Sequence, residues 1–117
     1  MIIIYITCKN KKEAEKIGLH LVKKRLAACA NIFPLIKSIF GWNGKIEKKN
    51  EAALIVKTIK NNFSKVEKEI KGLSSFATPC ILEISIARGS KNYLNWIEKE
   101  TKRGACPVEQ LRLASRH

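Results

Sequence analysis

The chain of 117 residues contains no aspartate and is poor in the residues that interrupt regular structure, with six glycines and three prolines. With 45% hydrophobic residues, this composition excludes collagen-like and disordered classes. The longest uncharged runs, such as residues 26–36, are also far shorter than the roughly 20 residues of a membrane-spanning helix. We therefore expect one folded domain without a membrane partner.

Disulfide and zinc frameworks are also missing. The four cysteines, Cys8, Cys29, Cys80 and Cys106, show no CxxC spacing, and three of them lie in apolar segments. We interpret them first as small, reduced side chains. Because the N-terminal segment is apolar before it is basic, the reverse of a secretory signal, we expect a cytoplasmic protein.

Positive charge dominates, with 23 Lys and Arg against 10 acidic residues and a net charge of +13. Such an excess is typical of proteins that bind nucleic acids or anionic membranes. Here the lysines are interleaved with glutamates, as in 12–16 and 65–69, which is typical of solvated helix faces. The charge alone therefore assigns no partner.

Hydrophobic periodicity and capping residues predict the element order β-α-β-β-α-β with a short C-terminal helix. The expected strands are 2–8, 27–35, 51–59 and 79–87, and Asn43-Gly44 predicts a hairpin between 38–42 and 45–47. Helices are expected from Asn10 to about Leu26, after Asn61 or Asn62 to near Gly72, and after Ser90, while Pro34 should mark a strand edge or a bulge.

This order is that of an α+β, ferredoxin-like sandwich with two helices on one face of an antiparallel sheet and a long hairpin. Residues 1–103 form the expected domain. Residues 104–117 lack Lys, Ile and Asn, and we interpret them as an appended or variable tail. Several strands are apolar on both faces although two helices cover only one, so we expect another copy of the chain to cover the second face.

Three sequence blocks stand in register on these elements: 24–31 (KRLAACAN), 42–58 with Trp42-Asn43-Gly44, and 93–97 (YLNWI). Together they closely resemble the CutA family of divalent-cation tolerance proteins over residues 2 to about 102. The resemblance implies a ferredoxin-like protomer in a homotrimer, and a role in tolerance of divalent metals such as copper. It further implies no established enzymatic activity, and an architecture like that of PII signalling proteins, which bind small effectors between subunits.

The resemblance also bears on metal ligands. The positions that match proposed copper ligands of some relatives are Ile6, Leu73 and Ser74, and none of these side chains binds a metal. Ser74 and Ala77 replace the usual His and Glu of the stretch before the last strand. Cys8 and Cys29 are the remaining candidates for a Cu(I) thiolate site. Burial as small hydrophobic side chains is the simpler interpretation of both.

A ligand-binding cleft between subunits is the second candidate site. Charged side chains in a buried strand need partners, which draws attention to Lys57 and Glu51. The candidate lining residues are Cys29, Trp42, Glu51, Lys57 and Glu83. An interface ion pair packed against Trp42 is an equally supported alternative. His20 is expected on the solvated face of the first helix.

Two other functions are alternatives to that of a CutA-like binding protein. The same element order occurs in RNA-recognition modules, but their third strand carries exposed aromatic residues, and residues 52–58 contain none. Nucleic acid is therefore disfavoured as a partner. A catalytic role is also disfavoured, because no Cys-His-acid set, Gly-rich phosphate loop or HExxH motif occurs. We expect a protein that acts by binding a metal or a small effector.

Overall fold

The computed structural model describes residues 1–102, and the expected tail 104–117 lies outside the described residues. The elements are β1 (Ile2–Cys8), α1 (Lys11–Lys23), β2 (Cys29–Trp42), β3 (Lys45–Thr58), a 3₁₀ turn (Lys60–Asn62), α2 (Phe63–Leu73), β4 (Ile81–Ser85) and α3 (Lys91–Thr101). The predicted order β-α-β-β-α-β with a C-terminal helix is confirmed. None of the described helices has the length and apolar character needed to cross a membrane.

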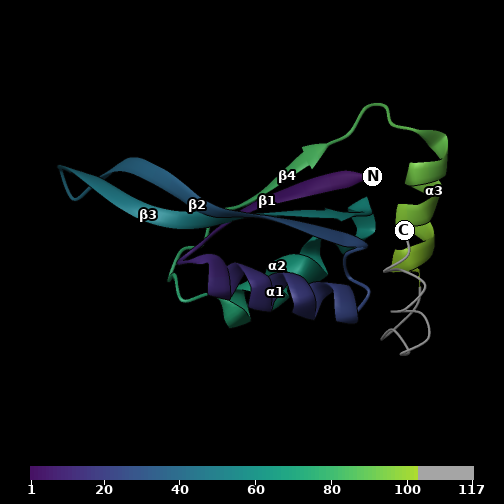
Figure 1. Cartoon of the computed structure of the whole chain (residues 1–117), viewed down its shortest axis with the longest axis horizontal. Coiled ribbons are helices and arrows are strands. Elements are labelled where there is room, and N and C mark those ends of the chain that lie inside the picture. Colours follow the sequence, from purple (N-terminus) through teal and green to yellow (C-terminus); the bar gives the residue numbers. More distant parts are fainter. Residues whose placement is uncertain (103–117) are drawn as a thin grey trace.

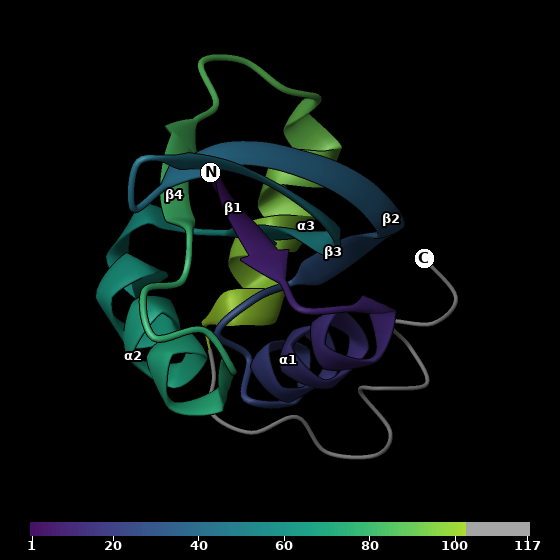
Figure 2. The ribbon, with the colours of Figure 1, turned by 90° about the vertical axis from the view of Figure 1, so that its left-hand side faces the viewer.

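The four strands form one antiparallel sheet in the order β2-β3-β1-β4, so the N-terminal strand is central and pairs with both β3 and β4. Helices α1 and α2 lie side by side against one face of the sheet (Figures 1 and 2). Helix α3 stands crosswise at the end of the sheet away from the hairpin tip (Figure 1). On the opposite face of the sheet, here called the open face, the described residues form no helix layer.

The hairpin of β2 and β3 is longer than its sequence pattern indicates. Each strand runs unbroken for 14 residues, whereas separate shorter segments were predicted. The outer half of β3 is mostly charged and exposed, so it carries no hydrophobic alternation, and main-chain pairing with β2 holds it. The turn at Asn43 (φ 51°) and Gly44 (φ 76°) confirms the predicted hairpin, and the register shifts beside Pro34 as expected of a bulge.

The core lies between the two helices and the sheet face that they cover. Its largest fully buried side chains include Ile4, Ile6, Ile17, Leu21, Leu54, Val56, Val66 and Ile70. Burial of each such side chain contributes about 1.5–3 kcal/mol. Gly18 lets α1 approach the sheet closely, since a Cβ at this position would lie 3.1 Å from the Cβ of Ala30.

Helix α1 ends three residues earlier than predicted, because the chain turns into the left-handed region at Arg25 (φ 58°). The N–H of Arg25 donates to the carbonyl of Val22, and that of Leu26 donates to the carbonyl of Leu21, both at 3.0 Å. These two bonds form a Schellman motif, in which glycine is the usual left-handed residue. The Arg25 side chain is only 4% exposed and donates to the Glu100 carbonyl of α3 at 3.0 Å. It therefore joins the end of α1 to α3.

Of the two predicted caps, Asn61 and Asn62, it is Asn62 that occupies the N-cap position of α2, but its side chain forms no capping hydrogen bond. Its buried side-chain amide points away from α2 and donates to the carbonyl of Leu26 and to the hydroxyl of Thr58. The Thr58 hydroxyl donates to the same Leu26 carbonyl at 2.7 Å. Satisfying these buried polar groups takes precedence over capping. Strand β4 is also shorter than the predicted 79–87, because only residues 81–85 pair with β1 in the ladder.

The open face is strongly apolar. Leu82 and Ile84 of β4 pair with Tyr5 and Ile3 of β1, so these four side chains share this face. Leu82 is 56% and Ile84 51% exposed, and Phe33 on the far strand is 52% exposed. The predicted two-sided apolar strands are thus present, and the described residues of one protomer leave the second side uncovered.

Candidate functional site

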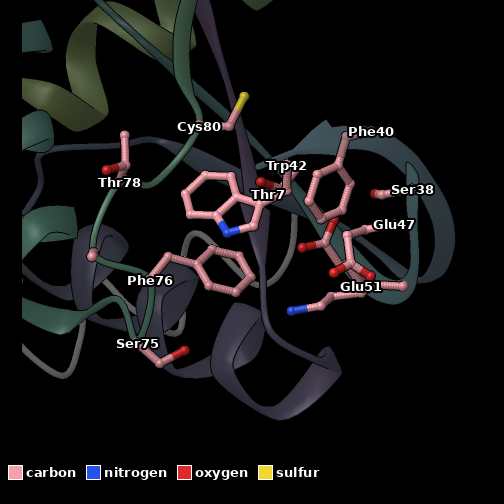
Figure 3. Close-up of a pocket in the computed structure, with 12 residues that line it drawn as sticks. Thr7, Ser38, Phe40, Trp42, Glu47, Glu51, Ser75, Phe76, Thr78 and Cys80 are labelled. Atoms are coloured by element: carbon pink, nitrogen blue, oxygen red, sulfur yellow. The ribbon is translucent and has the colours of Figure 1, made fainter. Parts of the chain in front are cut away.

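A pocket of about 660 Å³ lies between the outer half of the hairpin and the loop that joins α2 to β4 (Figure 3). Its lining residues are Thr7, Ser38, Phe40, Trp42, Glu47, Lys49, Glu51, Ser75, Phe76, Ala77, Thr78 and Cys80. Aromatic rings, carboxylates, one ammonium and one thiol therefore share a single cavity. Its volume falls in the range of about 300–1,000 Å³ that small-molecule sites occupy.

Strand alternation explains the hairpin side of the pocket. Ser38, Phe40 and Trp42 are spaced by two residues on β2, and their register partners on β3 are Lys49, Glu47 and Lys45. Residues at this spacing project from one face of a strand, and cross-strand partners share that face. Phe40, Trp42 and Glu47 therefore lie on one wall of the cavity (Figure 3).

The loop side is fixed by hydrogen bonds of its own. The N–H of Ser75 donates to the Glu13 carboxylate at 3.0 Å, and the N–H of Phe76 donates to the Ser74 hydroxyl at 3.1 Å. Burial would raise the pKa of Glu13, but the N–H groups of Lys9 and Ser75 outweigh it and lower that pKa below its usual value. An ionised Glu13 at the start of α1 thus holds Ser75, the neighbour of Phe76, at the edge of the cavity.

The two pocket carboxylates, Glu47 and Glu51, have no partner among the described residues. Glu47 and Glu51 are both half-buried, and within residues 1–102 neither side chain forms a salt bridge or a hydrogen bond. Lys49 lies between them in sequence and on the same face of β3. The three charged groups therefore give the cavity a net charge of about −1 in a chain whose net charge is +13.

The described cysteines are free and do not gather at one point. Cys8 is fully buried on the helix-covered face, whereas Cys29 is half-buried on the open face and two strands away. Burial raises the pKa of Cys8 to about 12, with smaller contributions from Glu13 and Glu51, so it remains a protonated thiol. The described part of the chain holds no group of three or more His, Cys, Asp or Glu that could bind a metal ion.

Cys29 and Lys57 are register partners, but they lie at the far end of the sheet from the pocket. The Lys57 ammonium donates to the Tyr93 hydroxyl of α3 at 3.1 Å and lies 5.3 Å from its ring centroid. This hydrogen bond to Tyr93 raises the pKa of Lys57 above its usual value despite partial burial. Lys57 was expected to need a partner because it lies in an apolar strand, and that partner is the hydroxyl of Tyr93.

Two further predicted residues lie elsewhere. Glu83 pairs in register with Ile4 on the helix-covered side, yet stays exposed at the sheet edge, away from the pocket. The prediction of a solvated His20 is wrong, since its ring is half-buried and its Nε2 lies 2.6 Å from the Glu69 carboxylate of α2. Lys24 reaches the same oxygen at 2.8 Å, so both residues join α1 to α2.

Of the predicted cleft residues, only Trp42 and Glu51 line the pocket. Sequence reasoning missed Phe40, Glu47, Phe76 and Cys80. Phe40 lies two residues before Trp42 on the same strand, so strand alternation could have indicated that both side chains share one face. Nothing local indicates Phe76 or Cys80, because their place in the pocket depends on how the α2–β4 loop meets a hairpin more than thirty residues earlier in the chain.

Comparisons with known proteins identify the family. The sequence profile of the CutA1 divalent ion tolerance protein matches residues 2–100. A divalent-cation tolerance protein CutA of Archaeoglobus fulgidus is 52% identical over 96 residues, which cover 82% of this chain and 93% of that protein. That of Thermus thermophilus is 36% identical over 99 residues, covering 85% and 96%.

Solved structures agree with the sequence relatives. The periplasmic divalent cation tolerance protein CutA of Archaeoglobus fulgidus superposes with a TM-score of 0.84 at 48% identity, covering 87% of this chain and 100% of that one. CutA1 of Oryza sativa gives 0.85 at 29% identity, covering 88% and 94%. The chain therefore belongs to the CutA1 divalent ion tolerance protein family.

Proposed function

We propose that this protein serves divalent-cation tolerance as a homotrimer that acts by binding and not by catalysis. The observation that carries the proposal is the pocket between the hairpin and the α2–β4 loop, which combines a cavity of ligand size with aromatic and charged side chains. Family membership supplies the biological context. Neither observation favours the RNA-binding alternative.

The apolar open face supports self-association. Phe33, Leu82 and Ile84 are each more than half exposed, and burial of such side chains contributes about 1.5–3 kcal/mol apiece. Monomeric soluble proteins rarely leave a contiguous apolar patch of this kind in water. A second and a third copy would cover it, in agreement with the resemblance noted above.

Between a metal ion and a small effector, the geometry supports the effector. A protomer provides no complete ligand set within residues 1–102, and Cys8 is a buried, protonated thiol. The pocket instead offers a cavity much larger than an ion, with ring surfaces that bind organic groups. This choice corresponds to the PII-like mode of effector binding.

The oligomeric state provides the first test. Light scattering should give about 40 kDa, three times the 13.2 kDa of the chain, at micromolar concentration. Replacing Leu82 and Ile84 together with Ser should shift the mass towards that of one chain, and Leu19→Ser, on the exposed side of α1, is the control that should not. A wild-type mass of 13 kDa would exclude the trimer.

Copper provides the second test. Expression of the chain in a copper-sensitive bacterial strain deleted for its own CutA-family gene should restore growth on copper sulfate. Titration of Cu(I) should give the same affinity for the wild type and for Cys8→Ser, Cys29→Ser and Cys80→Ser. Loss of a tight site in any of these variants would show that a metal ion is the ligand after all.

A further inference from the structure

We propose that the outer side of the helix layer, formed by α1 and α2, binds the phosphate backbone of a double-stranded nucleic acid. These two helices cover one face of the sheet (Figure 2). The trimer proposed above packs other copies against the opposite, open face, so self-association does not use the outer side of the helices. This activity is separate from divalent-cation tolerance and does not depend on the pocket.

Lysine side chains form the outermost ridge of α1. Lys12, Lys16 and Lys23 are exposed, and their spacing of four and then seven residues places them on one face of the helix. The buried residues of α1 lie on the opposite face: Ala14, Ile17, Gly18 and Leu21. Helix α2 adds Lys65 and Lys68, which are also exposed. These five residues, here called the outer lysines, therefore project from the side of the helix layer that points away from the sheet.

The outer lysines have no acidic partners. Within residues 1–102, none of the five side chains forms a salt bridge or a hydrogen bond. The glutamates of both helices are engaged elsewhere: Glu13 with backbone N–H groups, Glu15 with Lys11, Glu67 with Lys71, and Glu69 with His20 and Lys24. Although Lys and Glu alternate in the sequence, the fold thus leaves five uncompensated positive charges on one surface.

The dimensions of this surface suit a duplex. From Lys12 to Lys23 the helix rises about 16 Å, and packed helices lie about 8–10 Å apart. A duplex carries about one negative charge per 1.7 Å of its axis, so about ten phosphates fall within that length. Several of the outer lysines can therefore contact phosphates of one duplex at the same time. Each contact releases condensed counterions, which favours binding.

The other side chains of the helix layer favour a duplex over other polyanions. Single strands bind by stacking bases on exposed rings, but the one Phe, Tyr or Trp of α1 and α2, Phe63, packs against the core. Helices that bind membrane surfaces insert an apolar face, and here the apolar faces of both helices are buried in the core. Leu19 is the one large apolar side chain that these helices expose. Binding through the backbone also differs from RNA-recognition modules, which use the sheet.

Fluorescence anisotropy of a labelled DNA duplex of about 20 base pairs, titrated with the full-length chain, tests the proposal. Binding should be saturable at about 100 mM salt, should be the same within about threefold for two unrelated sequences, and should weaken steeply as salt rises. An unlabelled single strand of the same length should compete less well than the duplex, because the surface has no ring on which bases stack.

Two triple variants that remove the same charge locate the surface. Lys12→Gln, Lys16→Gln and Lys23→Gln together should weaken duplex binding about tenfold or more and reduce the salt slope by about 2–3. Lys91→Gln, Lys99→Gln and Lys102→Gln together remove three exposed lysines of α3 and should stay within about threefold of the wild type. Lys65→Gln with Lys68→Gln, on α2, should reduce the slope by about 1–2.

Circular dichroism and light scattering would verify that each variant keeps the fold and mass of the wild type. Three outcomes would overturn the proposal: no saturable duplex binding at about 100 mM salt, equal weakening by the two triple variants, or tighter binding to vesicles of phosphatidylserine and phosphatidylcholine than to the duplex. Equal weakening would show that only the total charge matters. The α1 triple variant should still restore growth on copper, so loss of duplex binding is distinct from loss of the proposed function.

Discussion

The carboxylate of Glu13 joins the first turn of α1 to the N–H of Ser75, 62 residues further along the chain, at 3.0 Å. Its other oxygen accepts the N–H of Lys9 at 2.8 Å. The same residue's own N–H donates to the side chain of the N-cap, Asn10. One helix-capping residue therefore also positions a wall of the candidate pocket.

Replacing Glu13 with Ala should lower the free energy of unfolding by about 1–2 kcal/mol, because two backbone donors lose their acceptor. Urea denaturation measures the change. Glu15→Ala is the matched control, since Glu15 forms only an exposed pair with Lys11 at 3.9 Å and should cost under about 0.5 kcal/mol. Equal losses in the two variants would show that the contact with Ser75 is not stabilising.

Acid should destabilise the protein through Glu69. Hydrogen bonds from Lys24, and then from His20, lower the pKa of Glu69 from 4.5 to about 2. Because the folded-state pKa lies below the unfolded value, the stabilising contribution is complete above about pH 5 and is lost as the pH falls towards 2. The urea midpoint measured between pH 5 and pH 2 should decrease accordingly.

Glu69→Gln should make that decrease shallower, since the variant has no carboxylate to protonate at this position. Glu67→Gln, on the same helix, removes a carboxylate that pairs only with Lys71 one turn away and should keep the wild-type slope more closely. If Glu69→Gln left the slope unchanged, the bridge from α1 to α2 would not contribute to acid sensitivity.

Arg25 combines an unfavourable backbone conformation with a buried side-chain contact. Arg25→Ala should destabilise the fold by about 2–4 kcal/mol, because the contact with Glu100 is lost while the left-handed φ remains. Arg25→Gly should cost about 1 kcal/mol less than Ala, since glycine adopts that φ freely. Thermal unfolding of both variants, followed by circular dichroism, tests this order. The reverse order would show that the backbone is not strained there.

Two helical glycines should respond to alanine in opposite ways. Gly18→Ala places a Cβ 3.1 Å from Ala30 and 3.3 Å from Leu54, so it should destabilise the protein by about 1–3 kcal/mol. At Gly72 nothing lies within 4 Å of the new Cβ, and the gain in helix propensity should stabilise by about 0.5–1 kcal/mol. Chemical denaturation of both variants measures the difference, and a stabilising Gly18→Ala would contradict the close packing of α1.

The elements that could be predicted from the sequence are those with a local cause. Ile2–Cys8 is a strand because it is apolar throughout, and Asn43-Gly44 is a turn because both residues adopt positive φ. The outer half of β3 could not be found in this way, since its charged residues 45–50 carry no hydrophobic signal and depend on pairing with β2.

The candidate site was predicted only in part, for a related reason. Trp42 and Glu51 are indicated by their residue types within a strand, which is local information. Phe76 joins them through a contact between a loop and a hairpin, and His20 meets Glu69 through the packing of two helices. Such long-range contacts depend on helix placement and loop geometry, which periodicity does not specify.

The central place of β1 has a consequence for synthesis on the ribosome. Strand β1 leaves the ribosome first and forms hydrogen bonds along both of its edges. One edge pairs with β3 and the other with β4, which ends at Ser85. Until about residue 85 has left the exit tunnel, an apolar strand keeps one row of N–H and C=O groups unpaired, and such edges favour aggregation. A translational pause after β3 and before β4 should therefore be the stage at which the nascent chain aggregates most readily.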